Sequence, residues 1–159
     1  MPTKARPPVE GDAAPEIELA DDGGNPFRLS SLRGKNVVLY FYPKANTSGC
    51  TKEACAFRDN SKKLTKADTV IVGVSPDKSA AQASFRAKYD LPFTLLADTD
   101  HKAAEAWGVW KEKSMYGRKY MGVERTTFLI DKKGRVARVF PKVKIEGHAE
   151  EVLEALEAR

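Results

Sequence analysis

The two cysteines of the chain, Cys50 and Cys55, lie five positions apart in the stretch YFYPKANTSGCTKEAC. Two thiols this close can hold a metal, form a structural disulfide or act as a redox pair. Cys50 lies where an apolar run ends and a helical pattern begins. A helix start presents free backbone N–H groups and the positive end of the helix dipole, which favour a thiolate. The thiolate is the nucleophilic form, so Cys50 is the predicted reactive group.

The spacing of the two cysteines carries a second argument. On a regular helix, residues five apart have Cα atoms roughly 8–9 Å apart and point about 140° away from each other. A disulfide usually needs Cα atoms roughly 4.4–6.8 Å apart. If the segment from Cys50 to Cys55 is helical, the sulfurs cannot join without local unwinding. This geometry favours a working redox pair, whose oxidation remodels the helix, over a permanent cross-link.

Three other interpretations of the cysteines stay open, although each fits less well. A zinc site would need His101 and His148, which lie far away at an unusual spacing, so no metal is expected. A structural disulfide is disfavoured by the helical geometry and by a reducing cytosol. A thioredoxin-type oxidoreductase typically carries C-x-x-C, whereas this chain has C-x-x-x-x-C.

Three more residues of the loop could take part in chemistry. Gly49 lets the backbone approach a bound molecule closely. Thr47 can offer its hydroxyl to a ligand or to the Cys50 sulfur. Pro43 fixes the direction in which the chain enters the loop.

The elements that must position this loop alternate between strands and helices. The continuous apolar run at residues 36–42 predicts a central strand covered on both faces. A second continuous apolar run at residues 69–75 and a shorter run at residues 93–97 predict two further strands. Apolar residues at helical spacing follow these strands and close the chain. The expected helices carry Ala54, Phe57, Ser61 and Leu64; Ala81, Phe85 and Tyr89; Ala103, Ala104 and Trp107 behind an Asp100 cap; and Ala149, Val152, Leu153 and Leu156.

Two hairpins flank this alternation. Residues 16–29 alternate around a Gly-Gly turn, and TTFLI and RVARVF flank the turn DKKG. Residues 108–124 are expected to be irregular. The order of elements predicts an α/β fold with a mixed central β-sheet flanked by helices and an N-terminal β-hairpin. We expect one domain over residues 1–159, with residues 1–14 as a loosely held lead-in.

Composition is that of a soluble, cytoplasmic protein. Apolar residues make up 42% of the chain and charged residues 31%, enough for a core and a solvated surface. The longest apolar runs reach about six residues, far from the roughly 18 that span a bilayer, so no membrane association is expected. The N-terminus lacks the apolar region of a signal peptide.

The net charge of +5 is unevenly distributed. Residues 111–144 hold 11 Lys and Arg against Glu112, Glu124 and Asp131, whereas the following segment is acidic. A basic region can bind nucleic acid or steer anionic ligands. No nucleic-acid motif accompanies the charge, so we interpret the region as a solvated surface and expect no nucleic-acid partner.

The stretch PKANTSGC fits the P-x-x-x-[TS]-x-x-C loop of peroxiredoxins. With the second cysteine five positions on, FYPKA before it and CAFRD after it, the chain resembles the bacterioferritin comigratory protein, or peroxiredoxin Q, group. The resemblance covers residues 9–158 and includes GDAAPEIEL, FTLLADTDHKAAEAWGVW and YGRKYMGVERTTFLIDKKG. Ser48 stands where many members carry proline, outside the defining positions.

The resemblance implies a thioredoxin-like fold and an atypical 2-Cys peroxidase that reduces hydrogen peroxide and organic hydroperoxides. Cys50 would be the peroxidatic cysteine, oxidised to a sulfenic acid. Cys55 would be the resolving cysteine, which forms an intramolecular disulfide with it. A thioredoxin-like dithiol would then restore both thiols. The resemblance implies no cofactor and no metal, and an intramolecular pair is compatible with a monomer.

The resemblance also assigns roles around Cys50. Arg125, in ERTTF, would be the cation that stabilises the thiolate and polarises the peroxide. Thr47, Gly49 and Arg125 would contact the substrate, and Pro43 would shield the sulfur from water. Glu53 could orient Arg125, or be an ordinary glutamate of a first helical turn.

Other polar and aromatic residues receive structural roles. Trp110 and Tyr116 are expected in core or loop packing, and His101 and His148 at the surface or at caps. The competing function is a redox-sensing binding module that uses the same cysteines and docks a partner on residues 111–144. Repeated peroxide turnover would distinguish the enzyme from the sensor.

Overall fold

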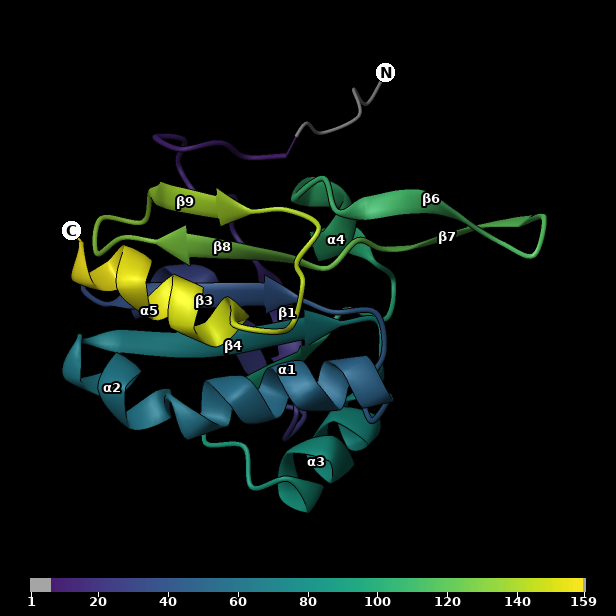
Figure 1. Cartoon of the computed structure of the whole chain (residues 1–159), viewed down its shortest axis with the longest axis horizontal. Coiled ribbons are helices and arrows are strands. Elements are labelled where there is room, and N and C mark those ends of the chain that lie inside the picture. Colours follow the sequence, from purple (N-terminus) through teal and green to yellow (C-terminus); the bar gives the residue numbers. More distant parts are fainter. Residues whose placement is uncertain (1–6, 159) are drawn as a thin grey trace.

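The computed structural model of the chain describes residues 7–158, built around a sheet of seven strands in the order β2-β1-β5-β4-β3-β8-β9 (Figure 1). Its strands are β1 (Glu18–Asp21), β2 (Pro26–Arg28), β3 (Asn36–Phe41), β4 (Thr69–Ser75), β5 (Thr94–Ala97), β8 (Thr126–Ile130) and β9 (Val136–Phe140). The neighbours β3, β4 and β5 run parallel, and the other pairs are antiparallel. The predicted mixed sheet and N-terminal hairpin are therefore confirmed.

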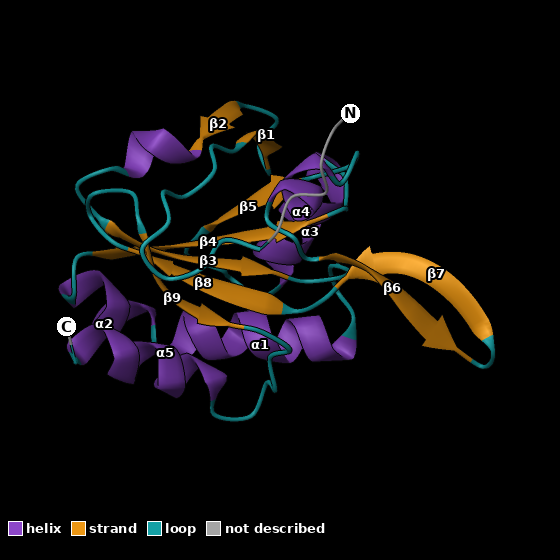
Figure 2. Cartoon of the chain, turned by 90° about the horizontal axis from the view of Figure 1, so that it is seen from above, coloured by secondary structure: helices purple, strands orange, loops and turns teal. Residues whose placement is uncertain are grey.

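Helices cover both faces of this sheet (Figure 2). They are the short 3₁₀ helix η1 (Leu29–Leu32), α1 (Ser48–Asp59), α2 (Ser61–Lys66), α3 (Ser79–Lys88), α4 (Lys102–Ala106) and α5 (His148–Glu157). Two further strands, β6 (Trp110–Met115) and β7 (Arg118–Val123), form a separate antiparallel hairpin that projects from the body.

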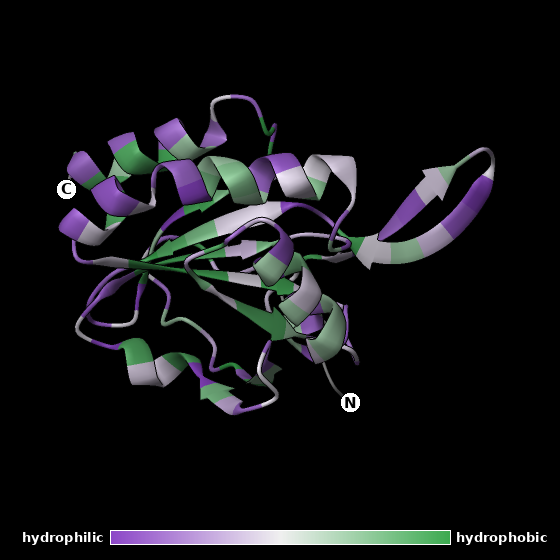
Figure 3. Cartoon of the chain, turned by 90° about the horizontal axis from the view of Figure 1, so that it is seen from below, coloured by the Kyte–Doolittle hydropathy of each residue, from purple (hydrophilic) through white to green (hydrophobic). Residues whose placement is uncertain are grey.

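Strand β3 lies in the middle of the sheet, parallel to β4 and antiparallel to β8. Its side chains alternate between two core layers: Val38 and Tyr40 pack with α1 and α5, whereas Leu39 and Phe41 pack on the other face. Apolar residues therefore occupy both faces, and the central strands are largely green in Figure 3. This double burial explains the uninterrupted apolar run in the sequence.

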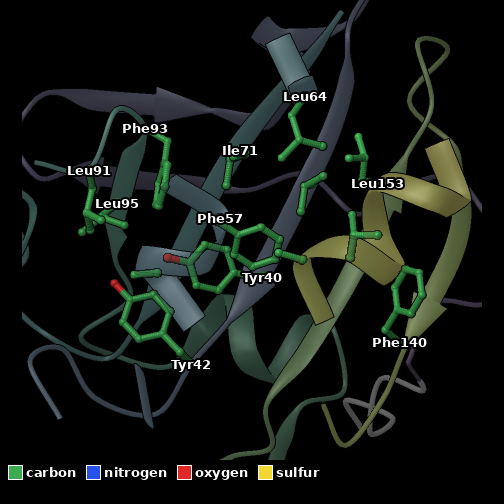
Figure 4. Packing of buried hydrophobic residues seen from close by; sticks show 14 of the residues in the cluster. Tyr40, Tyr42, Phe57, Leu64, Ile71, Leu91, Phe93, Leu95, Phe140 and Leu153 are labelled. Carbon is green, nitrogen blue, oxygen red and sulfur yellow. The ribbon is translucent and has the colours of Figure 1, made fainter. Parts of the chain in front are cut away.

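The Tyr40 ring anchors the layer under α1. It lies 4.9 Å from the Phe57 ring and close to Tyr42 (Figure 4). Gly73, on the neighbouring strand, makes room for it, because an added Cβ would lie 2.9 Å from Tyr40 Cζ. Packing of α1 on the sheet thus fixes the position of the helix that carries both cysteines.

The structure corrects several local predictions. The helix predicted from Ala54 to Leu64 is two helices, which separate at Asn60, where the side-chain amide donates to the Ala56 carbonyl at 2.8 Å. Asp98, and not Asp100, caps α4 by accepting from the backbone of Ala103 and Ala104. Short polar side chains compete with the helical backbone in this way, and apolar spacing does not reveal it.

Two further corrections concern burial. Gln82, and not Ala81, lies on the buried face of α3, because its amide bonds to Ser75 Oγ and to the Leu96 carbonyl. His148 was expected at the surface or in a cap but is buried, with Nε2 2.8 Å from Thr127 Oγ1. Burial lowers the pKa of His148. These polar residues are buried because each finds a hydrogen-bond partner.

Residues 108–124, predicted to be irregular, form the β6–β7 hairpin. Tyr116 and Gly117 make its turn with positive φ values of 51° and 77°, as a two-residue type I′ turn requires. The first part of the predicted lead-in, residues 1–6, lies outside the described residues. The later part of the lead-in bonds to β9: Gly11 N–H donates to the Val136 carbonyl, and Val136 N–H donates to the Asp12 carbonyl. No helix within residues 7–158 has the length and apolarity to cross a membrane.

Candidate active site

Cys50 lies in the first turn of the 12-residue helix α1, just beyond the carboxyl end of β3. Thr47 is the N-cap residue, with an extended backbone, and its carbonyl accepts from Thr51 N–H at 2.9 Å. The Cys50 side chain belongs to the core layer that also holds Ala54 and Phe57. It is only 1% exposed, so a molecule that reacts with the sulfur must enter a largely desolvated site.

Arg125 reaches Cys50 from the connection between β7 and β8. Its Nη2 donates to Cys50 Sγ at 3.2 Å, and its Nη1 donates to Glu53 Oε1 at 2.6 Å. Cys50 and Glu53 are three residues apart on α1, so they face the same side. The guanidinium group therefore bridges the thiol and the carboxylate, and it can stabilise negative charge on sulfur.

Two features place the Arg125 guanidinium. The backbone carbonyl of Arg125 accepts from Val143 N–H at 2.9 Å, which holds the β7–β8 connection against the segment after β9. Gly49 leaves space on the other side, since an added Cβ would lie 3.4 Å from Arg125 Nη2 and 3.3 Å from Ile145 Cδ1. A side chain at position 49 would therefore crowd Ile145 slightly and would contact the Arg125 guanidinium.

Glu53 is buried, with its side chain 1% exposed, and its Oε2 has no hydrogen-bond partner within the described residues. Burial raises the pKa of Glu53 to about 7, and the Arg125 charge opposes this rise only in part. Desolvation disfavours the carboxylate more than one ion pair favours it. The charge around Arg125 therefore changes in the neutral pH range.

Glu53→Gln should change how stability depends on pH. The carboxyl ionises in the unfolded chain near 4.5 but in the folded protein near 7, so wild type loses stability as pH rises through this window. The difference in unfolding free energy between wild type and variant should fall by on the order of 2–3 kcal/mol from about pH 5 to about pH 8. Denaturant unfolding under reducing conditions measures it.

The exposed Glu154→Gln on α5 serves as the matched control, and its difference from wild type should stay nearly constant over the same pH range. A constant difference for Glu53→Gln as well would show that Arg125 keeps Glu53 ionised throughout, contrary to the effect of burial.

Thr47 and Pro43 lie in the segment that leads to Cys50. Within the described residues, neither forms a side-chain hydrogen bond with the sulfur. The Thr47 side chain is exposed, and its hydroxyl donates to the Lys44 carbonyl at 2.8 Å. Pro43 is half-buried and follows β3 by two residues. Their predicted roles, a hydrogen bond to substrate and a shield from water, stay predictions.

Cys55 lies on the same continuous helix as Cys50, and both are free thiols. Its side chain is half-buried, whereas that of Cys50 is buried. Arg58, one turn further along α1, donates from Nη1 to the Tyr89 carbonyl at 2.8 Å, and its cation interacts with the Cys55 thiol. The reduced structure thus has the helical arrangement assumed in the spacing argument.

Sequence reasoning did not find Lys113 or Tyr40 near the site. Lys113, on β6, interacts electrostatically with Arg125 and Cys50. The buried Tyr40 hydroxyl has no hydrogen-bond partner within residues 7–158, and burial raises the pKa of Tyr40 far above its usual range. No local signal existed for Lys113, because its position depends on the pairing of β6 with β7. No signal existed for the Tyr40 hydroxyl.

Other aromatic and histidine residues lie away from Cys50. Trp110 stacks on the His101 ring with centroids 4.0 Å apart. Tyr116 is 99% exposed at the tip of the hairpin, so its predicted role in packing is wrong. His101 is the N-cap residue of α4, although its side chain makes no capping hydrogen bond. Within the described part of the chain, no group of three or more potential ligands could hold a metal.

Comparison with known proteins supports the fold and shows the family. The AhpC/TSA family model matches residues 10–139. Peroxiredoxin Bcp of Bacillus subtilis is 51% identical over 146 residues, covering 92% of this chain and 93% of the relative. The structure of peroxiredoxin Q from Xanthomonas campestris superposes with a TM-score of 0.86 at 40% identity, covering 90% of each chain.

A further structure, of the Xanthomonas campestris bacterioferritin comigratory protein, was solved to study alkyl peroxide reduction. It has a TM-score of 0.85 at 40% identity and covers 89% of this chain and 90% of that one. A thiol at the start of a helix, held by an arginine on a thioredoxin-like sheet, thus defines the class: the chain belongs to the AhpC/TSA family of peroxiredoxins, which are thiol-dependent peroxidases. Within that family its similarity is to the Bcp, or peroxiredoxin Q, group.

Proposed function

We propose that the chain reduces hydrogen peroxide and organic hydroperoxides with Cys50 as the attacking thiolate. The observation that carries the proposal is the Arg125 Nη2 contact with Cys50 Sγ at 3.2 Å in the first turn of α1. A fixed cation and a helix start both stabilise charge on sulfur. The same guanidinium can donate to a peroxide oxygen, while Thr47 and the Gly49 backbone contact the substrate and Pro43 limits water access.

The chemistry balances in three steps. The thiolate attacks the terminal peroxide oxygen, an S–O bond forms, the O–O bond breaks, and the leaving alkoxide or hydroxide takes up a proton. Cys50 is then a sulfenic acid. The Cys55 thiol attacks that sulfur, water leaves and a disulfide forms. A thioredoxin-like dithiol supplies two electrons and two protons through thiol–disulfide exchange.

Further observations support the proposed substrates, oligomeric state and compartment. The Xanthomonas campestris relative was studied for alkyl peroxide reduction, which supports organic hydroperoxides as substrates. The two free thiols on one helix make the cycle intramolecular, which requires no second subunit, so the proposal includes a monomer. A reducing cytoplasm suits a thiol that must be regenerated. The proposal involves neither nucleic acid nor membrane.

Steady-state peroxide consumption with thioredoxin, thioredoxin reductase and NADPH tests the proposed function. Turnover should exceed the enzyme concentration many times over, with NADPH oxidised in equal amount to the peroxide consumed. A single equivalent of peroxide consumed, with no further turnover under any dithiol, would instead identify a redox-sensing module.

Arg125→Ala should slow the reaction of the reduced protein with peroxide. The variant loses the charge-assisted contact with the Cys50 sulfur, worth about 1.5–3 kcal/mol, which corresponds to roughly a tenfold to hundredfold lower rate. Stopped-flow measurement of the first turnover reports this step alone. Arg138→Ala, an exposed residue of β9, is the matched control. A rate within twofold of wild type would show that Arg125 is a bystander.

Formation of the disulfide must disturb α1. Cys50 and Cys55 lie on one helix, where residues five apart are about 8–9 Å apart at Cα and face different sides. The bond requires an approach that an intact helix does not allow. Unwinding should therefore include residues 51–55 and the loop at residues 45–49, and should disturb the buried Phe57 ring.

Hydrogen exchange on the reduced and oxidised forms tests this coupling. Amides of residues 51–60 should exchange faster in the disulfide form, while β3 and β4 stay protected because they are central strands. The reduced form should also be the more stable to denaturant, although loop closure in the unfolded chain offsets part of the difference. Identical protection of residues 51–60 in both forms would contradict the coupling between chemistry and unwinding.

A further inference from the structure

The β6–β7 hairpin leaves the body at the end of the sheet where α1 begins (Figures 1 and 2). Its strands pair with each other and not with the seven-stranded sheet. Four of the five large hydrophobic side chains exposed within residues 7–158 lie on it: Met115, Tyr116, Tyr120 and Met121. A two-stranded hairpin is marginally stable alone, and clustered exposed apolar side chains mark interaction sites. The hairpin therefore has the properties of a docking element.

One face of this hairpin is positively charged. The cross-strand pairs Lys111–Gly122, Lys113–Tyr120 and Met115–Arg118 lie on the same face. We call Lys111, Lys113, Met115, Arg118 and Tyr120 the cationic hairpin face. Glu112, the single carboxylate of residues 110–123, lies on the opposite face, with Oε1 3.7 Å from Lys119 Nζ. The cationic hairpin face thus presents three positive charges, with Glu124, just beyond β7, as the carboxylate that interacts with Lys113. This excess of positive charge favours an acidic partner.

The same face is continuous with the active site. The Lys113 side chain lies back over Gly122, where an added Cβ would be 3.3 Å from Lys113 Cδ. Burial, and then the Arg125 charge, lower the pKa of Lys113, while the Cys50 thiolate and the Glu124 carboxylate act in the opposite direction. Strand β7 ends two residues before Arg125. A molecule bound to this face therefore lies beside the sulfur chemistry.

We propose that the cationic hairpin face docks the protein dithiol that reduces the Cys50–Cys55 disulfide, through carboxylates that surround the partner's thiols. This inference rests on the proposed function, which requires such a reductant. The partner has to approach the end of the sheet that carries Cys50, and the hairpin projects from that end. Met115 and Tyr120 supply apolar contact, and the three cations select an acidic surface.

Other occupants fit this face less well. A second copy of the chain would place the same positive charges opposite each other if the two faces met, and like charges repel across an interface. Nucleic acid is negatively charged, like an acidic protein reductant, but nothing in its chemistry requires a position beside Cys50. The experiment below separates it from a protein reductant.

The test compares two reductants on the same enzyme. Peroxide turnover is measured with bacterial thioredoxin plus its reductase and NADPH, and separately with dithiothreitol, which is uncharged and needs no docking surface. For Lys111→Glu/Arg118→Glu, the ratio of the two kcat/KM values (thioredoxin over dithiothreitol) should fall at least about tenfold, because complementary charge sets association. Arg118→Gln should give a smaller fall, and added salt should lower the wild-type ratio.

Lys133→Glu/Arg138→Glu is the matched control, because it makes the same charge change at exposed positions of the β8–β9 turn and of β9, and it should leave the ratio as in wild type. A ratio within twofold of wild type for Lys111→Glu/Arg118→Glu would overturn the docking inference alone. Wild-type turnover with dithiothreitol but not with thioredoxin would overturn the reductant assignment and the inference with it. An unchanged ratio, combined with loss of binding to a labelled DNA duplex at ~0.15 M salt, would assign the face to nucleic acid instead.

Discussion

Cys50→Ser is expected to lose peroxide consumption almost completely, in both the first turnover and the steady state. A serine hydroxyl at this position remains protonated at neutral pH and is a far weaker nucleophile than a thiolate, and the Glu53 carboxyl is bonded to Arg125 rather than to position 50. The rate should fall at least about a thousandfold, to that of the uncatalysed reaction. The measurement is peroxide loss after mixing with an excess of reduced enzyme.

A serine in place of the sulfur is close in volume, so the fold should survive, and thermal unfolding checks this. Peroxide consumption above a tenth of the wild-type rate in a folded Cys50→Ser protein would transfer the attacking role to Cys55. The same preparation should show one remaining thiol, the half-buried Cys55.

Cys55→Ser should separate the first turnover from all later ones. Cys50 keeps its contacts with Arg125, so one equivalent of peroxide should react at a rate close to that of wild type. The product has no second thiol in the chain to condense with, and it should accumulate as a sulfenic acid that gains one oxygen atom in mass. Turnover with thioredoxin should fall at least about a hundredfold, because its substrate, the disulfide, does not form.

Both outcomes for this variant are informative. Accumulated sulfenic acid with slow turnover supports Cys55 as the resolving residue. Loss of the first turnover equal to that of Cys50→Ser would remove the distinction between attacking and resolving cysteines. Undiminished steady-state turnover would show that the reductant attacks the sulfenic acid directly.

The central strands and the cysteine helix could be predicted from the sequence because their signals are local. A strand that is buried on both faces, such as β3, needs an unbroken apolar run. Cys50 and Cys55 are close in the chain, so the expected helix was enough to predict the distance between them and the directions in which they face. Arg125 lies 75 residues beyond Cys50, and no local pattern joins them, so only the family resemblance indicated that contact.

The β6–β7 hairpin could not be recognised from the sequence because it lacks such local signals. A strand is usually detected by one apolar face, and this hairpin packs only its base, near Trp110 and Val123, on the core. Its turn, Tyr116-Gly117, lacks the Asn-Gly or Asp-Gly pair that typically marks a type I′ turn. The prediction that His148 lies at the surface or in a cap was wrong because its burial depends on Thr127, a hydrogen-bond partner on the distant strand β8.

The end of α1 at Asn60 limits how far the helix unwinds in each catalytic cycle and therefore how fast it can re-form. Because α2 starts a new helix after Asn60, unwinding near Cys55 need not continue into the segment that packs Leu64. The unit that opens and recloses in each cycle is therefore about three turns long. A helix of this size relaxes in roughly 0.1–1 μs, whereas enzymes typically turn over at 1–10³ s⁻¹. Recoiling of α1 after reduction should thus be fast compared with turnover, so the helix itself should not limit the rate of the cycle.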